Sequence, residues 1–404
     1  MPPSKLVDFN TLRVPTTPVL VLLRRALERN LDVMQGRCRA AGVGLRAHGK
    51  MHKCTTIANL QVAKGAVGIC AQTVGEAQAF VGGGITDVLL TSPSAITAAQ
   101  RFVELARRAK VAAVVDDTPL VDAFGKAARA AGVVLDLLVD IDLGQHRTGV
   151  RPTEAVALAQ TIAATQGVRF AGVQGYAGHL QHMTSAPARL AANRKALEVL
   201  AQVVTLLRSA NLQAETVTGG GTGTHTGDLA SGVFTEIQAG SYAVMDAEYG
   251  ACEAPDGGEW PFEPALVLAS TVISARHRTH VTVDAGLKAL SVDGPAARII
   301  FGAAKNSVWR PMGDEHGAIL DPRSLSALNA VWRDPLALAA AIDAADAGPG
   351  ASIDTAKLGD IIWLQPGHCD PTINLHDAFL VAEAGGAWSR WPIDARRVTP
   401  GIGG

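Results

Sequence analysis

Residues 111–140 read VAAVVDDTPLVDAFGKAARAAGVVLDLLVD, and this stretch contains the repeating unit of the fold. Two apolar runs rich in valine and leucine, at 111–115 and 134–139, predict strands buried on both faces. Between them, residues 120–131 have the apolar spacing of an amphipathic helix. A strand, a helix and a second strand in this order predict a βαβ unit with parallel strands.

The same alternation extends in both directions along the chain. Further strands are predicted at 43–47, 67–70, 88–91, 169–174, 215–218 and 236–238, and helices at 25–41, 96–109, 153–165 and 188–209. About eight such units predict a closed (β/α)8 barrel of the TIM type. A doubly wound open sheet is the alternative, because strand boundaries from one sequence are loose.

The pattern changes after residue 264. Short apolar runs without helices between them predict strands at 266–274, 280–284, 360–364, 379–381 and 387–391. Residues 324–347, rich in Ala and Leu, predict a helical excursion that ends at a loop, 348–350. We therefore expect an α/β barrel domain over 25–262 and a second, mostly β, C-terminal domain over 263–404. An N-terminal segment, 1–24, with a strand at 18–23, joins the second domain.

Composition narrows the class of protein. The chain has 404 residues, of which 48% are hydrophobic and 18% charged, so it can bury a large core. Its net charge of −1 provides no basic field for nucleic acid or an anionic membrane. The five cysteines are scattered and odd in number, which argues against a disulfide framework. With no signal peptide and no apolar run of about 18 residues, we expect a cytoplasmic protein.

A basic segment, RAHGKMHK at 46–53, directly follows the first barrel strand. A lysine at the end of a buried strand is costly, because burial disfavours the ammonium ion. A lysine that forms a Schiff base must instead be neutral to act as a nucleophile. Lys50 is the better candidate because it lies nearer the strand than Lys53. The alternative, a solvated basic loop, stays open on these residues alone.

Glycines follow the seventh predicted strand, in TGGGTGT at 218–224. Such a loop brings backbone N–H groups and hydroxyls close to an anion. Barrel enzymes often bind phosphate after strands seven and eight, and residues 240–242, GSY, follow the eighth strand. The loop matches neither the Walker pattern nor GxGxxG, so it does not indicate a nucleotide.

Two other strand ends carry polar side chains. In DIDLGQHRTG, residues 140–149, Arg147 could hold a phenolate or carboxylate oxygen, or could form a local ion pair with Asp142. In QGYAGHLQH, residues 174–182, Tyr176 provides an aromatic face, and His179 and His182 provide acid–base groups. Each histidine taken separately is more often structural than catalytic.

The segment PGHCDPTIN at 366–374 contains a candidate metal pair. His368 and Asp370 lie on one face if the segment is extended, with Cys369 pointing the other way. An imidazole and a carboxylate suit Mn, Zn or Mg, with water in the remaining positions. The alternative is a Gly- and Pro-rich turn with an aspartate cap.

Taken in order, these segments resemble one family. The chain is similar to the D-threonine aldolase and 3-hydroxy-D-aspartate aldolase branch of the alanine-racemase-fold (fold type III) pyridoxal-phosphate enzymes. The motifs that carry the resemblance are HGKMHK at 48–53, GGGTG at 219–223, GSYAVMD at 240–246, VDAGLKA at 283–289 and PGHCDPT at 366–372. The resemblance extends from about residue 17 to about residue 391.

The resemblance implies a role for each matching residue. Lys50 would form the Schiff base with pyridoxal 5′-phosphate, Arg147 would contact the O3′ side of the cofactor, and Tyr176 would lie by its ring. The cofactor's phosphate would be held by Gly221, Thr222, Gly223, Ser241 and Tyr242. His368 and Asp370 would bind a divalent metal, and His182 is the family's active-site histidine. The family's dehydratases have His-x-Cys at the metal pair, whereas this chain has His-x-Asp.

The implied activity is cleavage of D-β-hydroxy-α-amino acids of the D-threonine type to glycine and an aldehyde. We expect manganese as the metal, with magnesium or zinc as alternatives, and a homodimer, since family members are dimers. A 3-hydroxy-D-aspartate aldolase giving glycine and glyoxylate, and a D-serine or 3-hydroxyaspartate dehydratase, stay open. Two other classes of protein also stay open: a non-catalytic pyridoxal-phosphate carrier and a metal-dependent hydrolase without the cofactor. Residues 324–347 form a longer stretch than the family implies before the metal pair.

Overall fold

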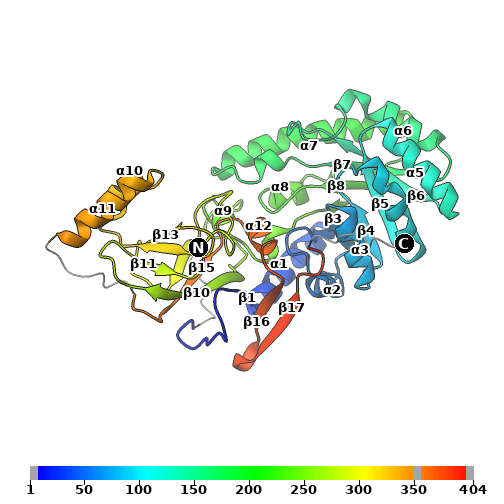
Figure 1. The fold of residues 1–404 in the computed structure, drawn as a ribbon. Helices are drawn as coiled ribbons and strands as arrows, with labels where there is room; N and C mark the ends of the chain where they lie inside the picture. Colours follow the sequence, from blue (N-terminus) through cyan, green and yellow to red (C-terminus); the bar gives the residue numbers. More distant parts are fainter. Residues whose placement is uncertain (1–7, 349–355, 397–404) are drawn as a thin grey trace. The chain divides into compact units, whose positions relative to one another are not determined.

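The computed structural model describes residues 8–348 and 356–396, which divide into two compact units (Figure 1). The barrel unit comprises Arg29–Ala243, Ala251–Phe262 and the described part of Pro392–Gly404, and the sheet unit comprises Val244–Gly250 and the described parts of Met1–Glu28 and Glu263–Trp391. The sequence predicts boundaries near residues 25 and 262, whereas each unit in the structure is assembled from separate stretches of the chain.

Eight parallel strands form the barrel, and pairing of the last with the first closes it. The strands are β2 (Gly44–His48), β3 (Gly68–Ala71), β4 (Asp87–Leu90), β5 (Lys110–Val115), β6 (Leu135–Ile141), β7 (Val168–Gly175), β8 (Thr216–Gly219) and β9 (Glu236–Ile237). Each coincides with a predicted strand to within two residues. The predicted barrel is therefore confirmed, and the open sheet is wrong.

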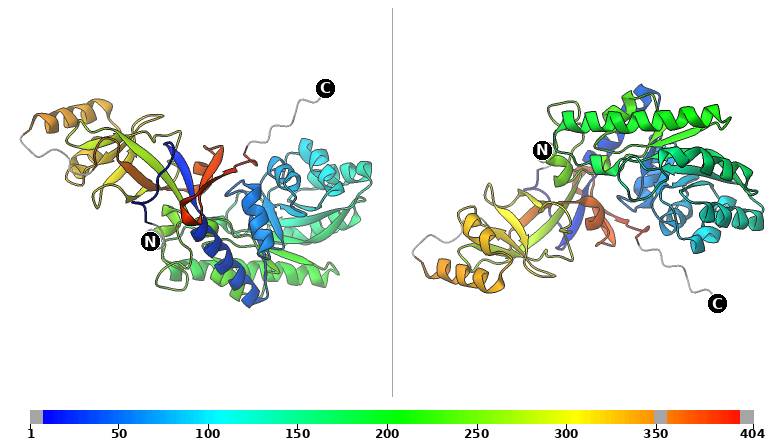
Figure 2. Two further views of the ribbon diagram at one scale, coloured as in Figure 1. Left: turned by 90° about the horizontal axis from the view of Figure 1, so that it is seen from below. Right: turned by 90° about the horizontal axis from the view of Figure 1, so that it is seen from above.

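Helices follow most of the strands and cover the outside of the barrel, as Figure 2 shows for α5, α6 and α7. They are α1 (Arg24–Ala41), α2 (Thr55–Ala63), α3 (Val74–Gly82), α4 (Ala99–Val103), α5 (Thr118–Ala131), α6 (Ala155–Ala164), α7 (Ala186–Ser209) and α8 (His225–Ala230). Local sequence explains their limits. In α5, the side chain of Asp117 accepts the N–H of Thr118, and Gly132 ends the helix with a positive φ of 69°.

One predicted helix, 96–109, is interrupted. The segment consists of 3₁₀ turns at Ile96–Ala98 and Glu104–Arg107 on either side of the short helix α4. Phe102 and Leu105 are both buried. Phe102 lies in α4 and Leu105 in the second 3₁₀ turn, so both parts of the interrupted segment direct an apolar side chain to the core.

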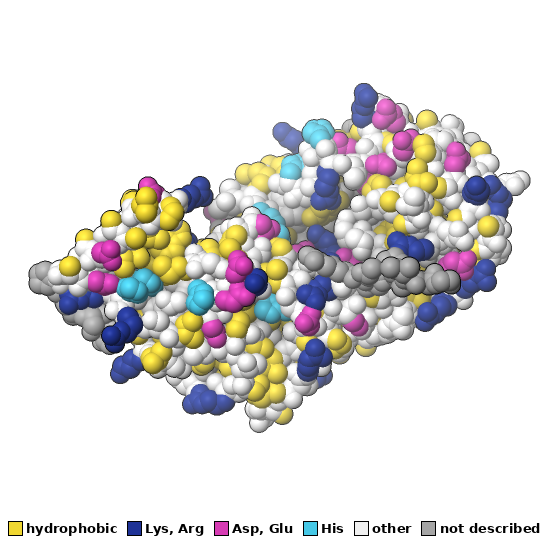
Figure 3. All heavy atoms as spheres, viewed as in Figure 1, with side chains coloured by type: hydrophobic (Ala, Val, Ile, Leu, Met, Phe, Trp, Pro, Cys, Tyr) yellow, Lys and Arg dark blue, Asp and Glu magenta, His cyan; other side chains and the backbone are white. Residues whose placement is uncertain are grey.

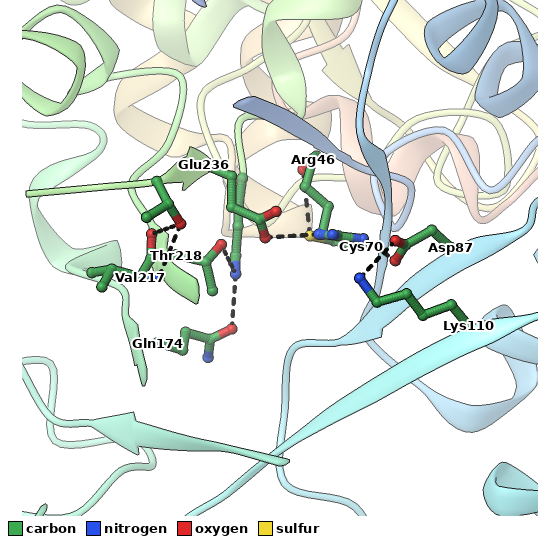
Figure 4. A network of polar contacts seen from close by, with 10 residues as sticks. Arg46, Cys70, Asp87, Lys110, Gln174, Val217, Thr218 and Glu236 are labelled. Carbon is green, nitrogen blue, oxygen red and sulfur yellow. Dashed lines mark hydrogen bonds and ion pairs between the residues drawn. The ribbon is translucent and has the colours of Figure 1, made fainter. Parts of the chain in front are cut away.

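A charged cluster lies among the residues that begin the barrel strands. Arg46 of β2 donates to Glu236, the first residue of β9, at 2.7 Å and to Asp87, the first residue of β4, at 2.6 Å (Figure 4). Lys110, the first residue of β5, lies 3.3 Å from Asp87. The Arg46 and Glu236 side chains are each only 8% exposed, so each needs the other's charge. This cluster is at the end of the barrel that ordinarily serves stability.

The sheet unit is built around one sheet with the order β13-β14-β11-β10-β1-β16-β17, and β15 pairs with β10 and β12. Its strands are β1 (Val19–Leu23), β10 (Leu266–Ser274), β11 (His280–Val283), β12 (Arg298–Phe301), β13 (Val308–Pro311), β14 (Gly317–Leu320), β15 (Ile361–Gln365), β16 (Ala378–Ala382) and β17 (Trp388–Pro392). The predicted second, mostly β domain is confirmed. Strands β12 to β14, of four residues each, were not predicted from the sequence.

The helical excursion predicted at 324–347 is also confirmed. It consists of α10 (Leu325–Val331) and α11 (Pro335–Ala347), which pack Leu328 and Ile342 against Ala318 and Leu320 of β14. Asp334 caps α11 by accepting the N–H groups of Leu336 and Ala337. Part of the loop predicted at 348–350 lies outside the described residues. Two short helices, α9 (Ala247–Gly250) and α12 (Cys369–Ile373), complete this unit.

Candidate active site

Most of the predicted cofactor-binding residues follow the carboxyl ends of barrel strands. Lys50 comes after β2, Arg147 after β6 and Tyr176 after β7. The glycine loop comes after β8, and Ser241 and Tyr242 come after β9. Because all eight strands are parallel and closed, these ends share one mouth of the barrel, which is where barrel enzymes place their active sites.

The backbone of Lys50 is fixed by a histidine of β2. The N–H of Lys50 donates to Nδ1 of His48 at 3.4 Å, and Nε2 of His48 lies 3.1 Å from Oγ1 of Thr91, just beyond β4. These contacts require the His48 proton to be on Nε2, where it donates to Thr91. The imidazole therefore connects two strand ends and holds the position of residue 50.

Lys53 has a different partner. Its ammonium lies 2.9 Å from the buried carboxylate of Glu76 in α3, and its φ is 49°. The carboxylate of Glu76 also accepts the N–H of Gln72, and the backbone N–H of Glu76 donates to the hydroxyl of Thr73, which caps the helix. This ion pair gives Lys53 a structural role, which agrees with the choice of Lys50 as the candidate nucleophile.

The segment after β6 brings Arg147 to the aromatic residue after β7. The Arg147 guanidinium carbon lies 5.8 Å from the centre of the Tyr176 ring, a cation–π contact. The alternative ion pair between Asp142 and Arg147 is not the arrangement found. Asp142 instead accepts the N–H groups of Gly144 and His146 and contacts the His146 ring at 2.7 Å.

Side chains within the barrel unit hold the glycine loop. The N–H of Gly221 donates to Asp228 at 3.2 Å, and that of Gly223 donates to Gln181 at 2.9 Å. The N–H of Tyr242 donates to Oγ1 of Thr222 at 3.0 Å, which joins the loop to the segment after β9. Within residues 8–348 and 356–396, no acceptor is found for the N–H of Thr222. That donor and nearby Ser241 fit the phosphate expected here.

Sequence reasoning missed the residues that support this loop. Thr224 accepts from Gln181 at 3.0 Å and donates to Asp228 at 2.6 Å. Asp228 is fully buried, and burial raises its pKa to about 6 against the lowering effect of bonds from Thr224, Asn193 and Gly221. The buried Arg189 of α7 donates to the carbonyl of Gly223 at 2.9 Å. An aspartate four residues after a loop threonine is a local signal in the sequence that could have indicated this support.

A second polar network lies inside the barrel (Figure 4). The amide of Gln174 donates to Asp140 at 2.8 Å and accepts from Gln238, which also donates to Thr218. Burial raises the pKa of Asp140 to about 6, and bonds from Gln174 and Thr148 oppose that shift. Asp140 and Gln174 begin the two segments 140–149 and 174–182, but the sequence did not predict a hydrogen bond between them.

His182 also belongs to the barrel unit. It follows the 3₁₀ turn Gly178–Leu180, and its carbonyl accepts the thiol of Cys252 at 3.5 Å. The next contact along the chain, from the N–H of Glu253 to the carbonyl of Thr184 at 2.9 Å, holds the same two segments together. The backbone is therefore held at His182 and two residues beyond it by the segment at 252–253.

The predicted metal pair lies in the sheet unit, but the extended segment assumed for it is wrong. His368 is extended, with φ −130° and ψ 123°, whereas Asp370 is in the first turn of α12. Both side chains are half-buried, while Cys369 is fully buried. Among the described residues, no group of three or more His, Cys, Asp or Glu side chains is arranged to hold a metal. The imidazole and carboxylate fit a dication whose other positions are taken by water or substrate.

Charges around this pair are acidic. Burial lowers the pKa of His368. The charge of Asp370 and a hydrogen bond to Asp293 raise this pKa by more than burial lowers it, so the net shift is upward. Glu248 of α9 also interacts electrostatically with His368, Asp293 and Asp370. Three carboxylates around one imidazole produce a negative potential that favours a divalent cation.

The surface charges agree with the nearly equal numbers of basic and acidic residues in the sequence. On the face drawn in Figure 3, Lys and Arg side chains are interspersed with Asp and Glu. In the part of the chain that the structure describes, no helix has both the length and the hydropathy to cross a bilayer.

The chain is similar to known proteins over most of its length. The sequence matches the alanine racemase N-terminal domain family over residues 23–248 and the serine dehydratase domain family over residues 265–382. It is 39% identical to the D-threonine aldolase of Arthrobacter sp., covering 94% of this chain and 92% of that protein. The chain belongs to the D-threonine aldolase and 3-hydroxy-D-aspartate aldolase branch of the alanine-racemase-fold enzymes.

Two further members of this aldolase branch are similar over nearly their whole length. The 3-hydroxy-D-aspartate aldolase of Paracoccus denitrificans (strain Pd 1222) is 36% identical, with 94% of this chain and 92% of that protein covered. The crystal structure of D-threonine aldolase from Filomicrobium marinum is 35% identical, with a TM-score of 0.81 over 94% of this chain and 96% of that one. The first family match contains Lys50, Arg147, Tyr176 and the glycine loop, and the second contains the metal pair.

Proposed function

We propose that this protein is a carbon–carbon lyase that cleaves D-β-hydroxy-α-amino acids to glycine and an aldehyde. One observation carries the proposal: Lys50, fixed on His48 at the end of β2, shares the barrel mouth with the Arg147–Tyr176 pair and the glycine loop. Membership of the aldolase branch supports pyridoxal 5′-phosphate as the cofactor.

Each residue of the mouth has an assigned task. Lys50 would hold the cofactor through its side-chain amine. Arg147 would neutralise the phenolate oxygen of the ring, and Tyr176 would lie beside the ring. Gly221, Thr222, Gly223, Ser241 and Tyr242 would form the phosphate-binding segment. The N–H of Thr222 and the hydroxyl of Ser241 would donate to the phosphate, because the N–H groups of the other three residues bond to Asp228, Gln181 and Thr222. When bound, the cofactor withdraws the electron pair of the breaking bond between Cα and Cβ.

Proton transfer is assigned to His182. Cleavage of the bond requires removal of the proton from the β-hydroxyl, and an imidazole is suited to this at neutral pH. We assign His368 and Asp370 as ligands of a divalent metal, manganese in our proposal, with magnesium or zinc as alternatives. The metal would supply Lewis-acid activation of the hydroxyl, which makes that proton easier to remove.

A dehydratase is the second candidate, because it shares the cofactor and the family. It would remove the Cα proton and give a keto acid and ammonia rather than glycine and an aldehyde. The His-x-Asp sequence at 368–370 favours the aldolase. Within the aldolases, a 3-hydroxy-D-aspartate substrate would give glyoxylate in place of acetaldehyde.

Absorbance spectroscopy and product analysis test the proposal together. The purified protein with added cofactor should absorb near the wavelengths of a pyridoxal Schiff base, and Lys50→Ala should abolish this band, whereas Lys53→Ala should retain it. Incubation with D-threonine or 3-hydroxy-D-aspartate should release glycine. Ammonia without glycine would identify a dehydratase, and a wild-type protein without the absorbance band would rule out the cofactor.

We also propose that the protein is a cytoplasmic homodimer. Light scattering of the purified protein should then give twice the 41.8 kDa mass of one chain. A mass of one chain at all concentrations would contradict the dimer.

A further inference from the structure

Three segments of the sheet unit converge on His368. The N–H groups of Ala247 and Glu248 donate to the carbonyls of Pro366 and Gly367 at 3.0 and 3.1 Å. A Cβ atom on Gly367 would lie 1.8 Å from the carbonyl oxygen of Pro295, so only glycine allows residues 295 and 367 to pass this closely. A Cβ atom on Gly294 would lie 3.4 Å from the Cβ of His368. The segment 291–295 is therefore packed directly against the metal motif.

Asp293 of this segment contacts the imidazole itself. Its Oδ2 lies 2.8 Å from Nδ1 of His368, and its Oδ1 accepts the hydroxyl of Ser291 at 2.6 Å. The backbone is joined as well. The N–H of Ser291 donates to Oγ1 of Thr372, whose hydroxyl donates to the carbonyl of His368 at 2.8 Å. Both the ring and the backbone of His368 are thus held from residues 291–293.

We propose that Asp293 is a positioning residue for the metal centre: its carboxylate accepts the Nδ1 proton of His368 and so directs the Nε2 lone pair to the dication. This rests on the metal role assigned to His368 above. A carboxylate can only accept, so the contact requires the proton on Nδ1. The tautomer and the ring orientation are then both determined before the metal binds.

One feature favours this indirect role over direct coordination by Asp293. Its oxygens are already engaged, one by His368 and one by Ser291. Carboxylates that accept from a metal-bound histidine raise the basicity of that ligand, and their loss typically weakens metal binding about 10- to 100-fold. The segment that carries Asp293 directly follows the motif 283–289, to which the proposed chemistry assigns no task.

Binding of Mn²⁺ alone, followed by the electron paramagnetic resonance signal of the unbound ion, tests the inference without reference to activity. We expect Asp293→Ala to weaken Mn²⁺ binding about 10- to 100-fold. Asp293→Asn should weaken it less, because the amide oxygen still accepts from Nδ1. His368→Ala should weaken it most. The matched control is Asp346→Ala, which removes a second His–Asp contact of the sheet unit, at 2.7 Å to His277, and should leave Mn²⁺ affinity unchanged.

The outcomes separate the two proposals. If wild type and His368→Ala bind Mn²⁺ equally, the assigned metal site is wrong and the role of Asp293 is lost with it. If His368→Ala loses binding but Asp293→Ala binds like the wild type, the metal site stands and the inference is overturned. Equal losses in Asp293→Ala and Asp346→Ala would show a general effect on the unit and would also overturn it. Should Asp293→Ala fail to fold, as judged by circular dichroism, the isosteric Asp293→Asn decides the same question.

Discussion

Two lysines of one motif illustrate how neighbours determine what a residue does. Lys50 and Lys53 are three positions apart, and the sequence places both just after β2. Lys53 forms an ion pair with the buried carboxylate of Glu76. Lys50 has its backbone held by His48, at the end of a strand that leads into the barrel mouth. The two lysines therefore differ in their contacts: Glu76 lies 23 positions from Lys53 in the chain, and His48 lies two positions from Lys50.

Arg147 carries a prediction at the residue scale. Arg147→Ala should weaken retention of pyridoxal phosphate, because it removes both the cation over Tyr176 and the charge for the phenolate. A hydrogen bond from Arg147 to the charged phenolate would contribute about 1.5–3 kcal/mol, so its loss corresponds to a change of roughly 10- to 150-fold in affinity. Cofactor release during dialysis, followed by absorbance, measures it. Arg151→Ala, in the same segment but 82% exposed at its side chain, should retain the cofactor as the wild type does.

His182 carries a second prediction. If it removes the β-hydroxyl proton, His182→Asn should lower kcat about 10²- to 10⁴-fold while the cofactor absorbance stays unchanged. The nearby His179 provides the control, and His179→Asn should keep most of the activity. Equal losses in both variants would argue that the segment's structure, and not the imidazole of residue 182, matters.

At the scale of elements, close approach between strands restricts which residues can begin the glycine loop. A Cβ atom on Gly219, the last residue of β8, would lie 1.9 Å from the carbonyl oxygen of Gly175 at the end of β7. The carbonyl of Gly219 accepts the N–H of Gln238 at 2.7 Å, so the same residue also connects to the segment after β9. The loop therefore begins from a position where three strand ends meet.

Gly219→Ala should consequently destabilise the barrel unit by several kcal/mol, since backbone atoms would have to move apart. Denaturant unfolding measures this. Gly36→Ala is the matched control: nothing lies within 4 Å of a Cβ atom there, and alanine in the middle of α1 should stabilise the protein by about 0.5–1 kcal/mol. A change below 1 kcal/mol in Gly219→Ala would contradict the predicted clash.

At the scale of the whole molecule, buried carboxyl groups connect stability to pH. Asp140 of β6 is bonded to Gln174 of β7, which is bonded to Gln238 beyond β9, so one network joins distant parts of the barrel. Burial raises the pKa of Asp140 to about 6, above the roughly 3.9 of an unfolded chain. The folded state thus binds this proton more tightly, and stability falls as pH rises between these two values.

The comparison of Asp140→Asn with the wild type isolates this effect. The free energy of unfolding of the wild type, relative to the variant, should fall by on the order of 3 kcal/mol from pH 3 to pH 7 and stay constant above that. Asp142→Asn should show the opposite sign. Although burial raises the pKa of Asp142, bonds from His146 and Gly144 lower it overall, so its contribution is lost as pH falls through the folded pKa. Denaturant unfolding at several pH values checks both, and equal slopes in the two variants would contradict this account.

Local patterns explain how much of the fold and the site could be predicted. The strand at 134–139 and the helix at 120–131 are visible as apolar periods in adjacent residues, and the structure places β6 and α5 there. The glycine loop and the basic motif were recognisable because their residue types follow strands directly. The conformation at His368–Asp370 was not, because a stretch of three residues has no period that distinguishes a strand from the first turn of a helix.

The sequence by itself determined the barrel, the mostly β second part and the motifs after each strand, since these follow from interactions among residues close in the chain. Only the tertiary structure decided which side chains hold those motifs in place. Gln181 supports Gly223 from 42 positions away, and Asp293 supports His368 from 75 positions away. Hydrogen bonds between such distant residues depend on how strands and helices pack, and packing leaves no pattern in either segment alone.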